Sequence, residues 1–243
     1  MIHMNQAYRS TASPATYPVE PRLSSRKTRI DYVREGAGIY RFASMTLLAI
    51  SILNTTANAT TLTIQEVRVL PAYCKAQQFI YSRIPELNTA QMAIEYNKWK
   101  STLGEPYQHV HHYCWALNYI NHSYTQLNSP RRKSLLGQAI ADASYTIRNV
   151  PNDFPLLPAM LTTRGKTYAL LDKLTEATAD LQRAISLNPK YDQSYAALGD
   201  LYKKMGKMDQ AKEIIQTGLK HVPNSKLLSK RAKELHIAAP HPE

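Results

Sequence analysis

The sequence predicts an all-α fold, built as a short right-handed solenoid of helical hairpins. Three observations support this prediction. The second half of the chain repeats with a period of 34 residues, it is rich in helix-forming Ala, Leu, Lys and Gln, and the apolar alternation typical of strands is scarce. We expect two regular units, irregular helices before them and a capping helix after them.

The repeat is clearest between residues 158 and 225. Four residue types recur 34 positions apart, as Gly165 and Gly199, Tyr168 and Tyr202, Ala177 and Ala211, and Pro189 and Pro223. Glycine and alanine allow two helices to approach closely, tyrosine fills the wedge between successive pairs, and proline ends the second helix because it cannot continue the hydrogen-bond ladder. The pattern therefore predicts one unit over 158–191 and another over 192–225.

These residues resemble the tetratricopeptide repeat family, of a secreted or periplasmic bacterial type. The matching positions are Leu161, Gly165, Tyr168, Ala177, Leu181, Ala184 and Pro189, and then Leu198, Gly199, Tyr202, Ala211 and Pro223. The resemblance implies that the first helix of each pair lines a concave groove, which takes an extended peptide or a partner helix. The groove residues implied by position are Ala159, Thr162, Lys166, Ala169, Gln193, Ala196, Asp200 and Lys203.

One partner class of the family is not expected. Thr162 and Lys166 stand where family members that clamp the C-terminal carboxylate of a chaperone carry a Lys and an Asn. The groove instead looks mildly basic and lined by small residues.

The flanking segments are less regular. We expect an irregular unit over residues 111–157. Trp115 would begin its first helix, and Ala139, Ala143 and Pro151 match the pattern of a second helix. The interval from Trp115 to Ala139 is 24 residues, against 16 from Leu161 to Ala177, so we expect a bulging loop near residues 128–130. Residues 60–110 supply N-terminal helices, residues 226–238 a capping helix with one apolar face, and residues 239–243 a tail.

Residues 34–59 have the three parts of a secretory signal. Arg34 and Arg41 precede the apolar run Phe42–Leu53, and the segment ends in Ala57-Asn58-Ala59. A helix needs about 20 apolar residues to span a bilayer, more than this run offers. We therefore expect cleavage after residue 59, a periplasmic or secreted protein and no integral membrane domain after cleavage.

Two alternatives remain for the N-terminal part of the chain. The protein could stay anchored in the inner membrane through residues 42–53. Residues 1–33 are either a disordered cytoplasmic arm or an incorrectly assigned leader, with translation starting nearer Val33 or Met45, and our hypothesis is the incorrectly assigned start.

The charge is basic but not patterned for nucleic acid. The formal net charge is +12, of which residues 1–59 carry +4 and residues 60–243 carry +8. The tight basic runs after residue 59 are Arg131-Arg132-Lys133 and the group Lys226, Lys230, Arg231 and Lys233. Neither is interleaved with aromatic residues that could stack on bases. Nucleic acid is therefore not an expected partner.

The densest group of reactive side chains lies between His109 and Trp115. Imidazole and thiolate at helical spacing make His109, His111, His112 and Cys114 candidate ligands for zinc or copper. The sequence shows no second ligand cluster and no neighbouring acid to orient a histidine. With two cysteines in an exported chain, Cys74 and Cys114 favour a single disulfide between neighbouring helices instead.

No catalytic residue and no cofactor site is predicted. The sequence has neither a Gly-rich phosphate loop after a strand nor a G-x-S-x-G elbow. We therefore expect a non-enzymatic adaptor of the bacterial cell envelope, which docks a protein or peptide partner in its groove. The alternative is a metal- or haem-handling periplasmic protein that uses the His109–Cys114 segment.

Overall fold

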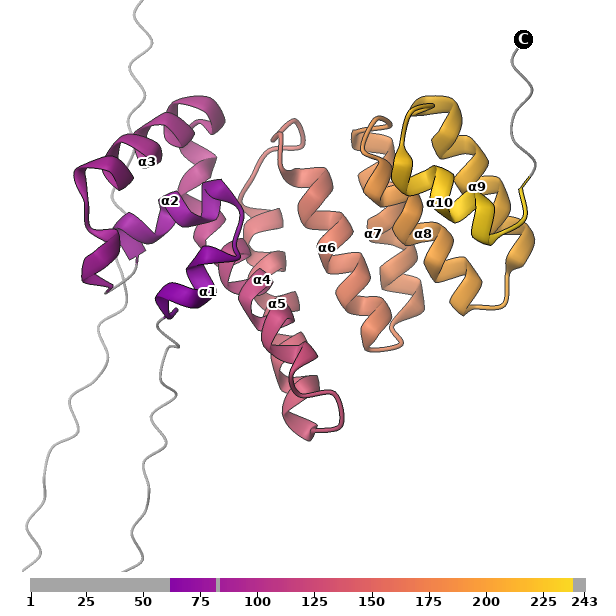
Figure 1. Cartoon of the computed structure of the whole chain (residues 1–243), viewed down its shortest axis with the longest axis horizontal. Coiled ribbons are helices and arrows are strands. Elements are labelled where there is room, and N and C mark those ends of the chain that lie inside the picture. Colours follow the sequence, from indigo (N-terminus) through magenta and orange to yellow (C-terminus); the bar gives the residue numbers. More distant parts are fainter. Residues whose placement is uncertain (1–61, 82–83, 238–243) are drawn as a thin grey trace, which may run out of the picture. The chain divides into compact units, whose positions relative to one another are not determined.

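The computed structural model describes residues 62–81 and 84–237, all of which lie in one compact unit, residues 55–243. In these two ranges the chain forms ten α-helices, two short 3-10 helices and no β-strand, which confirms the predicted all-α hairpin fold (Figure 1). The predicted leader (1–33), signal or anchor (34–59) and tail (239–243) lie outside the described residues. No helix in the described ranges is both long enough and apolar enough to span a membrane.

Two regular helix pairs follow one another in the C-terminal half. The first comprises α6 (Leu157–Leu170) and α7 (Leu174–Leu187), and the second comprises α8 (Asp192–Lys204) and α9 (Met208–His221). Each pair turns through three residues, and the middle residue has a positive φ, 57° at Asp172 and 73° at Gly206. These two turn residues are themselves 34 positions apart, so the period extends into the turns.

Glycine brings the two helices of each pair into contact. A Cβ added at Gly165 of α6 would lie 2.9 Å from Cγ of Leu181 in α7, and one added at Gly199 would lie 2.8 Å from Cδ1 of Ile215. Both distances are shorter than real carbon contacts, so a side chain at Gly165 would have to displace Leu181, and one at Gly199 the end of the Ile215 side chain. The predicted role of these two glycines in close approach is confirmed.

The irregular unit consists of α4 (Val110–Tyr124) and α5 (Pro130–Arg148). Trp115 lies in the second turn of α4 rather than at its start. The predicted bulging loop is wrong, because the extra residues are mostly helical. α5 begins nine residues before Ala139, whereas α7 begins three residues before Ala177, and the connection between α4 and α5 is only residues 125–129. In Figure 1 this hairpin extends past the turn between α6 and α7.

The predicted N-terminal helices are three in the described residues before 104. They are α1 (Ile64–Arg68), α2 (Ala72–Tyr81) and α3 (Ala90–Leu103), with 3-10 turns at Pro85–Leu87 and Glu105–His109. A disulfide joins Cys74 of α2 to Cys114 of α4, and both residues are fully buried. The predicted bridge is therefore present, and it fixes these helices to the first hairpin.

The last helix, α10 (Lys226–Glu234), covers the end of the second regular pair. Its residue Leu228 is fully buried against Tyr195 of α8 and Ile215 of α9. The amphipathic pattern therefore correctly indicated a helix that closes the core, although this helix ends at residue 234.

Candidate functional site

The candidate site is an open cleft of about 460 Å³ between α6, α8 and α10. Four of the predicted groove residues line it: Lys166 of α6 and Gln193, Ala196 and Asp200 of α8. The remaining lining residues are Asp192, Ala197, Leu227 and Arg231. The first helices of two successive pairs and the closing helix therefore meet around one hollow.

The other predicted groove residues lie elsewhere. Thr162 is only 3% exposed, because its hydroxyl donates to the carbonyl oxygen of Pro158 at 2.8 Å and lies 2.9 Å from Oγ of Ser194. It joins α6 to α8 inside the core, so its assignment to the partner surface is wrong. Ala159 and Ala169 are half-buried outside the cleft, and Lys203 is exposed near the end of α8, also outside it.

The charged groups of the cleft are mostly paired. Arg231 donates to both carboxylate oxygens of Asp200, at 3.0 Å from Nε and 2.9 Å from Nη2, and these hydrogen bonds raise the pKa of Arg231. Asp192 accepts a hydrogen bond from Ser225 at 2.5 Å. Within the described residues Lys166 forms no ion pair. Two charged groups of the cleft therefore have no ion-pair partner, the ammonium of Lys166 and the carboxylate of Asp192, and they lie beside a small apolar floor of Ala196, Ala197 and Leu227.

Leu227 and Arg231 were missed by the sequence reasoning. They lie 34 residues after Gln193 and Ala197, which also line the cleft, so α10 occupies the place of the first helix of a third unit. The 34-residue period continues beyond residue 225. It would have identified Leu227 and Arg231 as lining residues if the last helix had been treated as part of the repeat and not only as a cap.

The histidine cluster lies on α4 and is organised by aromatic contacts. The rings of His111 and His112 lie 5.1 Å and 5.0 Å from Trp115, and the ring of His112 lies 4.1 Å from Tyr145 of α5. Burial lowers the pKa of His111 to about 4. The hydrogen bond that its Nδ1 donates to the carbonyl oxygen of Gln108 raises the pKa, but by less than burial lowers it. The imidazole of His111 is therefore neutral at pH 7.

Two histidines of α4 have acidic partners, His112 of the cluster and His122 beyond it, whereas the sequence predicted no acid close to the cluster. Nδ1 of His112 lies 2.7 Å from Oδ1 of Asp142 in α5, and Nε2 of His122 contacts Oε1 of Glu66 in α1. The acids are 30 and 56 residues away along the chain, so local spacing gave no sign of them.

The geometry does not assemble the proposed metal ligands. Among the described residues no three His, Cys, Asp or Glu side chains are placed to share a metal ion. The sulfur of Cys114 is bonded to Cys74, so it is neither a thiolate ligand nor a nucleophile. His109 turns toward another partner, because its Nδ1 lies 3.3 Å from the hydroxyl of Tyr145.

Comparison with known proteins supports the helical repeat. Residues 170–234 match the family described as tetratricopeptide repeat, a range that contains α7 to α10. This match includes α10, in agreement with its position one period after α8. No curated protein sequence matches the chain significantly.

Solved structures that align with the chain include tetratricopeptide proteins. A thermophilic tetratricopeptide protein of Thermus thermophilus is 23% identical, with a TM-score of 0.50 over 69% of this chain and 80% of that one. The tetratricopeptide domain of Sgt2 from Aspergillus fumigatus is 20% identical, with a TM-score of 0.39 over 50% and 76% of the two chains. The second such domain of human RPAP3, in complex with an HSP70 peptide, is 19% identical, with a TM-score of 0.37 over 51% and 98%.

Proposed function

We propose that this protein is a non-enzymatic adaptor of the bacterial cell envelope, which docks a peptide or helix of a partner protein in the cleft between α6, α8 and α10. The observation that carries the proposal is the ammonium group of Lys166 at the edge of this hollow, which has no ion-pair partner in the described part of the chain. Helical-hairpin solenoids present such concave surfaces to extended ligands.

The chemistry of the cleft favours a partner segment with an acidic side chain and small apolar neighbours. A carboxylate would form an ion pair with Lys166, and the amide of the exposed Gln193 is available for further hydrogen bonds. Alanine and leucine side chains on the floor accept apolar groups without a hydrogen-bonding penalty. The ion pair between Asp200 and Arg231 holds α10 against α8 and so keeps this wall of the cleft in place.

The envelope location rests on two observations. The N-terminal segment has the pattern of an export signal, and the buried disulfide between Cys74 and Cys114 requires an oxidising compartment to form. Both properties are typical of secreted and periplasmic proteins.

The test is affinity capture from envelope extracts with the wild type and two charge reversals. Lys166→Glu places a carboxylate in the cleft, whereas Lys203→Glu makes the same charge change on the same face outside it. We expect Lys166→Glu to remove the specifically captured partner and Lys203→Glu to retain it within about twofold, because exposed charges outside an interface contribute little. Equal capture by the wild type and Lys166→Glu would refute the cleft as the docking site.

A further inference from the structure

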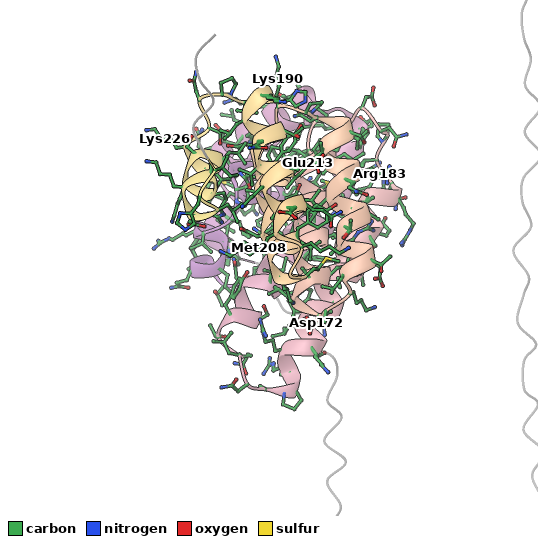
Figure 2. The ribbon with its side chains drawn as sticks, turned by 90° about the vertical axis from the view of Figure 1, so that its right-hand side faces the viewer. Asp172, Arg183, Lys190, Met208, Glu213 and Lys226 are labelled. Carbon is green, nitrogen blue, oxygen red and sulfur yellow. A yellow bond between two sulfur atoms is a disulfide. The ribbon has the colours of Figure 1, made fainter. Side chains whose placement is uncertain are left out.

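The hairpin of α4 and α5 ends in a tip that no other unit has within the described ranges. We define the tip as residues 124–133, which include the end of α4, the connection and the first turn of α5. Relative to the matching alanine, α5 starts six residues earlier than α7, which at about 1.5 Å per residue adds about 9 Å of helix. In Figures 1 and 2 the tip extends beyond the adjacent helix turns, and Asp172, labelled in Figure 2, lies beside the hairpin above its end.

The tip combines exposed apolar side chains with a run of basic side chains. Tyr124 is 52% exposed and Leu127 is 59% exposed, although both are large and apolar. Arg131, Arg132 and Lys133 follow within six residues, and within the described chain none of the three forms an ion pair. A stretch from residue 106 to residue 141 contains no Asp or Glu at all.

Carboxylates on neighbouring elements offset the charge of the tip only in part. Glu66 of α1 is engaged by His122, close before the tip in the chain. Asp172 of the α6–α7 turn lies near Lys133, but it is paired with Nζ of Lys204 at 2.6 Å. The protruding end therefore keeps a net positive charge.

We propose that this tip docks the protein on an anionic lipid surface. Basic side chains are attracted to anionic headgroups within a Debye length of the membrane, while Leu127 and the amphipathic ring of Tyr124 suit the boundary between headgroups and acyl chains. Nucleic acid would satisfy the positive charge but would leave Leu127 in water. A stable protein interface usually uses about 20 to 30 residues on each side, which is more than a ten-residue tip supplies.

The second basic group of the chain provides a matched control. Lys226, Lys230 and Lys233 of α10 are also exposed, but α10 has no exposed large apolar side chain. If the combination of charge and apolar surface decides binding, reversing charges on α10 has little effect.

The experiment places an environment-sensitive fluorophore on the tip of the full-length chain. Both native cysteines are bridged, so Leu127→Cys gives a single reactive thiol. Ile94→Cys on α3, which is 60% exposed and lies on a helix packed against α2 rather than on the tip, gives the reference position. Because the probe reports on its own surroundings, membrane binding through another segment does not imitate insertion of the tip.

Each labelled protein is titrated with vesicles of phosphatidylcholine alone or with about a third phosphatidylserine. We expect a blue shift at position 127, none at position 94, and no shift at either position with neutral vesicles. Adding Arg131→Glu and Lys133→Glu should weaken the response at least about tenfold, whereas Lys226→Glu with Lys230→Glu should change it less than about twofold. The absence of a shift at position 127, an equal shift with neutral vesicles, or an equal loss on reversing α10 would overturn the proposal.

Discussion

Arg164 connects three helices through one guanidinium group. Its Nε and Nη2 each donate to a carboxylate oxygen of Asp180 in α7 at 2.7 Å, and its Nη1 donates to Oγ of Ser144 in α5 at 2.9 Å. Burial lowers the pKa of Arg164, but the hydrogen bonds and the charge of Asp180 outweigh it and raise the pKa above its usual value. The side chains of Arg164 and Asp180 are 15% and 10% exposed, so each charge is stabilised mainly by the other and little by water.

We therefore predict that Asp180→Ala strongly destabilises the fold. It leaves a mostly buried guanidinium without its counter-charge, which costs about 3 kcal/mol of unfolding free energy. Urea denaturation followed by circular dichroism measures the change. Arg183→Ala is the control, since Arg183 donates one exposed hydrogen bond to Asn152 and is expected to cost no more than about 0.5 kcal/mol. A similar loss in the two variants would contradict the prediction.

His111 makes the stability depend on pH. Its pKa is lowered to about 4, first by burial and further by the neighbouring His112 and His109. An unfolded histidine has a pKa near 6.5, so between these values the unfolded chain takes up a proton that the folded chain does not. This contribution to stability is complete above about pH 6.5 and is lost as the pH falls toward about 4.

His111→Gln is expected to reduce this dependence, because glutamine does not titrate. The urea midpoint should fall less between about pH 7 and about pH 4.5 in the variant than in the wild type. His236→Asn, at an exposed residue after α10, should keep the slope of the wild type. Equal slopes for the wild type and His111→Gln would contradict the assignment.

At the scale of the element, two glycines in neighbouring helices have opposite roles. Gly165 in α6 faces α7, where an added Cβ would lie 2.9 Å from Leu181 Cγ and 3.2 Å from the carbonyl oxygen of Ala177. Gly137 in α5 is exposed. Apart from its chain neighbours and the backbone of its own helix, no atom lies within 4 Å of a Cβ added there. The first glycine sets the helix spacing, and the second only lowers helix propensity.

Alanine substitutions should therefore shift stability in opposite directions. Gly137→Ala should stabilise the protein by about 0.5 to 1 kcal/mol through helix propensity. Gly165→Ala should destabilise it by about 1 to 2 kcal/mol, because separating α6 from α7 costs more than the propensity gained. Thermal and urea unfolding measure both changes. A stabilising Gly165→Ala would show that α7 moves away at no cost.

The helices of the regular pairs could be predicted from the sequence, because the distance between paired helices depends on small residues that recur every 34 positions. Gly165, Gly199 and the prolines after α7 and α9 carry that signal in the chain itself. The length of α5 could not be predicted, since Pro130 suits either a loop or a first helical turn. The burial of Thr162 and the pairing of His112 with Asp142 depend on contacts between helices, to which local spacing is blind.

For the whole described unit, the disulfide is a covalent cross-link, in addition to the backbone, between the N-terminal helices and the hairpins. It joins α2 to α4 across 40 residues, and its sulfur atoms lie in the core with Tyr107 and Val110. The hydroxyl of Tyr107 also donates to the carbonyl oxygen of Tyr73 at 2.7 Å, beside the bridge. The helices before residue 104 are therefore held to α4 by this region and by the contact between Glu66 and His122.

Replacing both cysteines by alanine should lower the free energy of unfolding by about 3 to 4 kcal/mol, since the bridge closes a long loop in the unfolded chain. In a solenoid each unit contacts mainly its neighbours, so the loss should remain local. We expect hydrogen exchange in the double variant to show faster exchange of α2 and α3 and nearly unchanged protection of α8 and α9. Equal loss of protection from α2 to α9 would instead show that the unit unfolds as a single cooperative block, with the bridge stabilising all of it.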